Sequence, residues 1–190
     1  QDEYLMSLWS QNVKEGFWIA STKSWEEWSQ AKMIEKVIDY KAKMDEYIHA
    51  VGRENLVIRK YDRKEFVGGN IYEDFLQTIG LKMEDDFLIP EREKNPGLKG
   101  NTNEIRRIIN TIPGIKGIDH TFFKDTLLEF SKKKKKDYPS HIMSESEREE
   151  LMNRCAEGNR EVARLMYGDA RELFEKDSHS LPKWKKENPY

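Results

Sequence analysis

The 190-residue chain has little cysteine and little histidine: one thiol, at Cys155, and four histidines that are scattered along it. A single thiol forms no internal disulfide, so the sequence excludes a disulfide-built scaffold and a zinc site made of cysteines. Because no two histidines have the spacing of metal ligands, we expect no metal centre. The lone thiol is typical of a reducing compartment and predicts a cytoplasmic protein.

Long apolar runs are also absent, since no stretch approaches the roughly 18 residues of a membrane span. The chain has no excess of one charge either, because 33 basic and 35 acidic residues give a net charge of -2. We therefore do not expect a protein whose whole surface binds nucleic acid. The run Lys132–Lys136 is the exception, and it indicates either a contact for a polyanion or a solvated end of a helix.

Familiar catalytic motifs are missing as well. The sequence has no G-x-x-x-x-G-K-[ST] phosphate loop, no G-x-S-x-G nucleophile elbow and no H-E-x-x-H metal motif. The many acidic pairs are expected by chance among 35 carboxylates. No catalytic residue can therefore be assigned from motifs of this kind.

Large aromatic side chains are abundant, with 5 Trp, 8 Tyr and 8 Phe, and they favour a packed domain over disorder. Four of the tryptophans fall within the first thirty residues, where core filling is favoured over stacking on a ligand, with Trp18 as the expected exposed exception. We expect a single domain over residues 1–176, followed by an extended tail over 177–190.

Most of the chain has the periodicity of amphipathic helices. Ser24 and Ser144 each begin a capping box, and Asn70 has the character of an N-cap. On the helix that begins near Thr102, we expect the isoleucines to face inward. The expected helices cover 1–15, 25–28, 33–51, 71–79, 102–112, a segment around 122–130, and 145–167.

Residues 56–61 form the one convincing strand, because Leu56, Val57 and Ile58 are consecutive apolar residues. Such a run is typical of a strand that is buried on both faces, as in a parallel sheet covered by helices. The expected fold class is therefore α/β, with one clear buried strand and a helical C-terminal half.

Three segments, in this order, resemble the sulfotransferases that use 3′-phosphoadenosine 5′-phosphosulfate (PAPS), especially bacterial proteins that act on glycans. Ser7 and Trp9 resemble the family's helical serine and the aromatic residue that follows it. The other two segments are Gly52–Asp62 with the helix that follows it, Ile71–Leu81, and Ser144–Phe174, which includes Asn159–Ala163 and Tyr167-Gly168.

The resemblance implies a P-loop-type parallel-sheet fold, of which this chain would be the helix-rich C-terminal portion. It implies that Ser7 binds the 3′-phosphate of PAPS, and that Lys99 and Gly100 match part of an Arg-Lys-Gly contact to the same phosphate, with Leu98 in place of the arginine. The phosphate loop, an arginine partner of Ser7 and the catalytic base would precede Gln1, so we expect the domain to be incomplete at its N-terminus.

The implied activity of the complete protein is transfer of a sulfuryl group from PAPS to a hydroxyl of a glycan or a small molecule. We expect this chain alone to be inactive. The alternative is a non-catalytic helical module that contacts a glycan or a protein partner.

Overall fold

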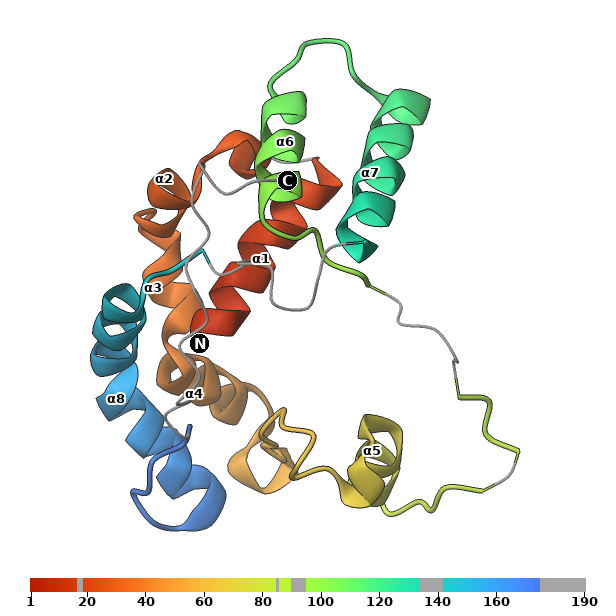
Figure 1. The fold of residues 1–190 in the computed structure, drawn as a ribbon. Coiled ribbons are helices and arrows are strands. Elements are labelled where there is room, and N and C mark those ends of the chain that lie inside the picture. The colour runs from red at the N-terminus through yellow and green to blue at the C-terminus, as the bar shows by residue number, and fades with distance from the viewer. Residues whose placement is uncertain (17–18, 85, 90–94, 134–141, 175–190) are drawn as a thin grey trace.

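The computed structural model describes residues 1–16, 19–84, 86–89, 95–133 and 142–174, which form an assembly of helices (Figure 1). The tail over 177–190, Trp18 and Trp184 lie outside the described residues. The α-helices are α1 (Asp2–Glu15), α2 (Trp25–Ser29), α3 (Met33–Ile38), α4 (Tyr40–Val51), α5 (Ile71–Thr78), α6 (Asn101–Asn110), α7 (Gly117–Lys132) and α8 (Glu145–Tyr167). Short 3-10 turns are η1 (Ile19–Thr22), η2 (Arg53–Asn55) and η3 (Val67–Gly69).

The expected α/β class with a parallel sheet is wrong, because the described residues contain no strand. Residues 56–61 contact the protein on one side only: Leu56 and Ile58 are half-buried, while Val57 and Tyr61 are 63% and 78% exposed. No backbone N–H from Val57 to Tyr61 donates to a described backbone carbonyl. Consecutive apolar residues predicted burial on both faces, but a strand also requires a neighbour with which to share a hydrogen-bonded ladder.

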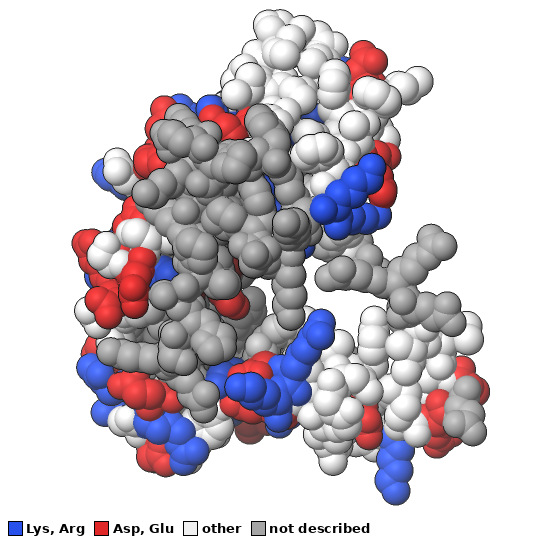
Figure 2. Space-filling model, viewed as in Figure 1, with Lys and Arg blue, Asp and Glu red and all other residues white. Residues whose placement is uncertain are grey.

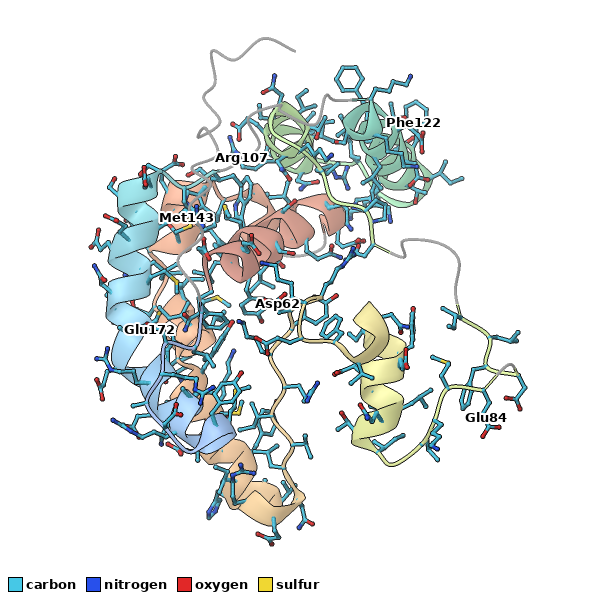
Figure 3. The ribbon with its side chains drawn as sticks, turned by 60° about the horizontal axis from the view of Figure 1, so that its bottom comes forward. Asp62, Glu84, Arg107, Phe122, Met143 and Glu172 are labelled. Atoms are coloured by element: carbon cyan, nitrogen blue, oxygen red, sulfur yellow. The ribbon has the colours of Figure 1, made fainter. Side chains whose placement is uncertain are left out.

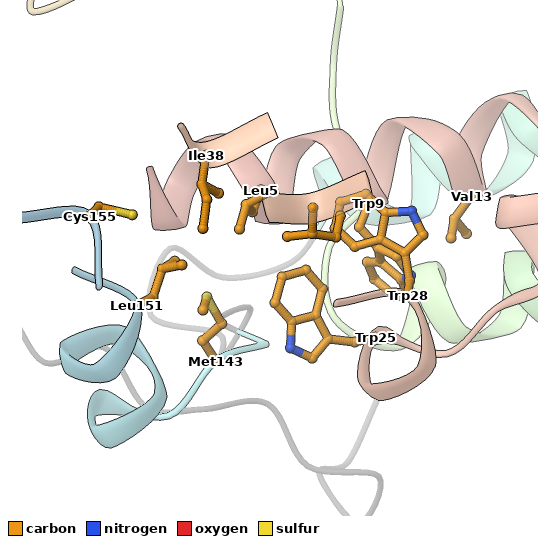
Figure 4. Close-up of a cluster of buried hydrophobic side chains, with 10 residues drawn as sticks. Leu5, Trp9, Val13, Trp25, Trp28, Ile38, Met143, Leu151 and Cys155 are labelled. Atoms are coloured by element: carbon orange, nitrogen blue, oxygen red, sulfur yellow. The ribbon is translucent and has the colours of Figure 1, made fainter. Parts of the chain in front are cut away.

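Helix α1 lies at the centre of the larger group of helices (Figure 1). Leu5, Trp9 and Val13 form an apolar stripe on it, and each is at most 4% exposed. The stripe packs in one core with α2, α3 and α8 (Figure 4). Trp25 meets the ring of Trp9 edge-on at 6.1 Å. The core-filling role predicted for the tryptophans is confirmed for Trp9, Trp25 and Trp28.

The predicted capping residues are confirmed. Ser24 and Ser144 each form a complete capping box, and the Asn70 side chain accepts hydrogen bonds from the first turn of α5. The helix expected over 33–51 is instead two helices, α3 and α4. Asp39 leaves the helical conformation between them, and its carboxylate accepts a hydrogen bond from the Ala42 N–H at 2.9 Å, so it caps α4.

The prediction for helix α6 is wrong for two of its four isoleucines, since Ile105 and Ile109 are half-buried but the fully buried face is polar. Its buried residues are Asn101, Thr102, Asn103 and Arg106, whereas Ile108 and Ile112, just beyond its end, are 50% and 49% exposed. The polar face turns inward because α1 ends against it with unpaired carbonyls. Arg106 Nε donates to Lys14 O at 3.2 Å, and Asn110 Nδ2 donates to Val13 O at 2.8 Å.

Helix α8 is anchored to the start of α1 by a pair of side-chain amides. Gln1 Nε2 donates to Asn159 Oδ1 at 3.0 Å, and Asn159 Nδ2 donates to Gln1 Oε1 at 2.9 Å. Gln1 Nε2 also donates to Ile38 O at 2.9 Å. Both amides are buried, so α1, α3 and α8 share one satisfied polar contact beside the core. None of the helices in the described part of the chain is long and apolar enough to cross a membrane.

The variant Asn159→Ala is expected to lower the free energy of unfolding by about 1–3 kcal/mol, because it removes both hydrogen bonds between the two amides and leaves the buried Gln1 Oε1 without its donor. Asn153→Ala is the matched control, since Asn153 is exposed on the same helix and its loss is expected to change stability by less than about 0.5 kcal/mol. Denaturant unfolding measures both, and equal values for the two variants would contradict the anchoring role.

Candidate functional site: a polar groove along helix α1

A groove of about 310 Å³ runs between α1 and the segment that leads into α6. Its walls come from parts of the chain that are far apart in sequence. Ser7, Gln11 and Lys14 share one face of α1 because they lie four and seven residues apart, and this face points away from the Leu5–Trp9–Val13 stripe. The lining residues are Glu3, Met6, Ser7, Ser10, Gln11, Lys14, Asn95, Gly97, Leu98, Lys99, Asn103 and Ile142.

Lys14 brings a buried positive charge to the groove. Only 4% of its side chain is exposed, and its Nζ donates to Asn95 Oδ1 and, at 3.2 Å, to Pro96 O. Burial lowers the pKa of the Lys14 ammonium, and the carboxylate of Glu15, 3.9 Å away, offsets part of this effect. Because an ammonium has three N–H donors, the two bonds to residues 95 and 96 leave one donor for a ligand.

The opposite wall is held to α1 by the side chain of Asn103. Its Oδ1 accepts a hydrogen bond from Ser10 Oγ at 2.8 Å, and its Nδ2 donates to Leu98 O at 3.2 Å. The Lys99 N–H donates to Thr102 Oγ1 at 2.9 Å and to Ser131 Oγ at 3.2 Å. These contacts fix the position of the Lys99 backbone in the wall of the groove, while the Lys99 side chain is exposed.

Two of the three residues predicted to bind the nucleotide meet in this groove. Ser7 and Lys99 both line it, and both are exposed. Gly100 is buried and does not line the groove. Its backbone has φ 51° and ψ -119°, a conformation that favours glycine, so Gly100 provides the turn that brings the chain from Lys99 into α6.

Lys14, Ser10 and Asn103, which also line the groove, were not among the site residues predicted from the sequence. The helical spacing from Ser7 to Lys14 was available as a signal for the first two, whereas the burial of Asn103 follows from the unexpected orientation of α6. The metal prediction is not contradicted: among the described residues, no three His, Cys, Asp or Glu side chains group as metal ligands. Of the run Lys132–Lys136, the first two lysines are exposed at the end of α7, and 134–136 lie outside the described residues.

A second polar cluster lies where α1 ends. Gly16 has φ 68°, in the left-handed region, and it ends the helix. A Cβ atom at this position would lie 2.6 Å from His120 Nε2, 2.9 Å from Asn110 Oδ1 and 3.0 Å from Arg106 Nη2. Burial lowers the pKa of His120, and the neighbouring Arg106 charge lowers it further. Side chains of α6 and α7 therefore close tightly around this glycine.

Comparison with known proteins gives one distant relative. An uncharacterized protein of Archaeoglobus fulgidus is 28% identical over 170 residues, which cover 88% of this chain and 44% of the relative. The chain thus spans less than half the length of the curated relative that it matches. No family model and no solved structure matches the chain.

The variant Gly16→Ala is expected to destabilise the protein by several kcal/mol, because it combines the cost of a left-handed alanine, about 1–2 kcal/mol, with overpacking, about 1–3 kcal/mol. Gly168→Ala is the matched control, since Gly168 ends α8 with φ 81° and a Cβ there meets no atom within 4 Å. Thermal unfolding separates the two contributions. Equal losses of stability would show that the cluster is loosely packed around Gly16.

Proposed function

We propose that the groove along α1 binds the 3′-phosphate of PAPS, and that the chain is part of a protein that transfers a sulfuryl group from this donor to a hydroxyl of a glycan or a small molecule. One observation carries the proposal. Ser7 and Lys99, which resemble two separate phosphate contacts of the PAPS-dependent family, line one groove although they are distant in sequence.

The chemistry of the groove suits one phosphate group. The Ser7 hydroxyl can donate a hydrogen bond to a phosphate oxygen, and the ammonium groups of Lys99 and Lys14 supply positive charge. The Glu3 carboxylate also lines the groove and repels an anion, so the phosphate is expected to lie toward Lys14 and Lys99 rather than toward Glu3. A volume of about 310 Å³ is at the small end of ligand pockets, typically about 300–1,000 Å³, and is suited to one part of a nucleotide.

Sulfuryl transfer, like phosphoryl transfer, depends on positioning the donor and on stabilising charge in the transition state. The residues of the groove supply positioning and charge. The resemblance matches no residue of this chain to the family's catalytic base, and the chain spans less than half of its archaeal relative. The proposed role of these 190 residues is therefore to hold the donor, with transfer requiring further parts of the whole protein.

Calorimetry with adenosine 3′,5′-bisphosphate tests the groove. Ser7→Ala is expected to weaken binding about tenfold, because a hydrogen bond to a charged phosphate is lost. Ser146→Ala is the matched control, since Ser146 is an exposed serine on α8, and this variant is expected to bind as the wild type does. Adenosine 5′-monophosphate, which has no 3′-phosphate, is expected to show no difference between Ser7→Ala and the wild type. Equal affinities of the wild type and Ser7→Ala for adenosine 3′,5′-bisphosphate would contradict the proposed site.

A second candidate function, a helical interaction module, is favoured by one surface. We define the α6–α7 patch as Ile108, Ile112, Ile118 and Phe122, which are 50%, 49%, 87% and 62% exposed. Uncharged side chains gather over this end of the two helices (Figure 2), and Phe122 lies on the outer side of the pair (Figure 3). An exposed apolar patch of this kind is typical of a protein contact.

Sedimentation velocity over a range of protein concentrations tests this second function, with self-association as the readout. If the α6–α7 patch binds a second copy, the double variant Ile118→Ser/Phe122→Ser is expected to shift the protein toward monomer, because the contact loses its apolar area. The control Tyr47→Ser removes an aromatic ring that is 56% exposed on α4, and it is expected to leave association unchanged. A wild type that stays monomeric at every concentration would argue against association through this patch.

A further inference from the structure

Helix α5 lies apart from the helices that surround α1 (Figure 1). One of its faces is fixed to the segment that precedes it. Asp74, which is 5% exposed, accepts hydrogen bonds from the Val67 N–H at 3.1 Å and from Arg59 Nε at 3.3 Å. Leu76 and Phe66 are buried beside this contact. These residues hold the inner face of α5 and leave its outer face uncovered.

The uncovered face is an apolar stripe. We define the α5 stripe as Ile71, Tyr72, Phe75 and Ile79, which are 41%, 41%, 60% and 52% exposed. Spacings of three and four residues place these side chains on one side of a helix. Leu81 is 51% exposed and is held beside the end of α5, because its N–H donates to Leu76 O at 2.8 Å. An amphipathic helix normally turns such a stripe toward a core, so its exposure indicates a contact with another molecule.

The apolar surface continues beyond α5. Phe87, Leu88 and Ile89, in the segment that follows, are 42%, 98% and 46% exposed. Uncharged side chains gather over this part of the molecule (Figure 2). Together with the α5 stripe and Leu81 they expose on the order of 800 Å², at roughly 200 Å² for each large side chain when fully exposed. A stable dimer takes about 800 Å² from each partner, so the area is sufficient for an interface between two copies.

The charges around the α5 stripe favour a second copy of the chain over a membrane. Helices that lie on a membrane surface carry Lys and Arg on their polar face, whereas the charged residues of α5 are Glu73 and Asp74. Lys82 is exposed just beyond the other end of the helix. In an antiparallel pair of α5 helices about a two-fold axis, Glu73 of each copy lies near Lys82 of the other. The helix dipoles are also antiparallel in this arrangement.

We propose that two copies of this chain form a dimer in which their α5 stripes pack antiparallel against each other, with Glu73 of one copy beside Lys82 of the other. Tyr72 and Phe75 supply the aromatic centre of the contact. This surface is distinct from the groove at Ser7 and from the α6–α7 patch, so the inference rests on neither function proposed above.

Sedimentation velocity of the full chain over a range of concentrations tests the dimer. Phe75→Ser/Ile79→Ser is expected to raise the dissociation constant at least about hundredfold, because each substitution removes apolar area twice in a two-fold contact. Met33→Ser/Val51→Ser is the matched control, since it removes side chains that are 55% and 49% exposed on α3 and α4, and it is expected to leave the dimer unchanged. A wild type that is monomeric at every concentration would overturn the proposal, and so would equal dissociation constants for the wild type and Phe75→Ser/Ile79→Ser.

A charge exchange tests the antiparallel arrangement and does not depend on the folding of the apolar variant. Glu73→Lys and Lys82→Glu are each expected to weaken the dimer about threefold to tenfold at low salt, because each places like charges side by side. The double variant Glu73→Lys/Lys82→Glu is expected to restore the affinity of the wild type. Single variants that dimerise as the wild type does would overturn the arrangement, as would a double variant that dimerises no more tightly than the single ones.

The same measurement on Ile118→Ser/Phe122→Ser separates the two apolar surfaces. This variant is expected to form the α5 dimer as the wild type does. A loss of the dimer in this variant would place the α6–α7 patch in the contact and overturn the pairing of α5 with α5.

Discussion

The structure depends on the burial of helix α1. Its apolar stripe of Leu5, Trp9 and Val13 removes large side chains from water, and each contributes about 1.5–3 kcal/mol when fully buried. Helices α2, α3 and α8 supply the other side of that core. Because a helix has only one such face to bury, the opposite face of α1 is left for polar groups, and it is there that Ser7, Gln11 and Lys14 line the groove.

The end of α1 imposes a second constraint, since its last carbonyls have no partners within the helix. Helix α6 satisfies two of them with Arg106 and Asn110, and this requires its polar face to turn inward. Exposure of Ile108 and Ile112 follows directly. One capping arrangement thus links the buried guanidinium, the wall of the groove at Asn103 and the apolar patch on α6 and α7.

Local signals in the sequence were sufficient for most of the helices. Ser24, Asn70 and Ser144 each carry a side-chain oxygen next to a helix start, and the structure uses all three as caps. Asp39 is a capping residue of the same kind and could have predicted the break between α3 and α4. The apolar periodicity over 33–51 continues across it, and so it indicated one long helix instead. For the groove, the resemblance to PAPS-dependent sulfotransferases pointed to Ser7 and Lys99, but not to Lys14, which belongs to the same face of α1.

By itself, the sequence determined where α2, α5 and α8 begin, which residues cap them and which stripe of α1 is apolar, because these properties depend on neighbours within one or two turns. Only the tertiary structure decided that residues 56–61 have no strand partner among the described residues, and that Arg106 is buried while Ile108 and Ile112 are exposed. Both outcomes depend on groups distant along the chain: a neighbouring ladder in the first case and the unpaired carbonyls of α1 in the second. The order of apolar residues along the chain does not reveal where such distant partners lie. It therefore predicted burial for Val57, Ile108 and Ile112, which are exposed in the structure.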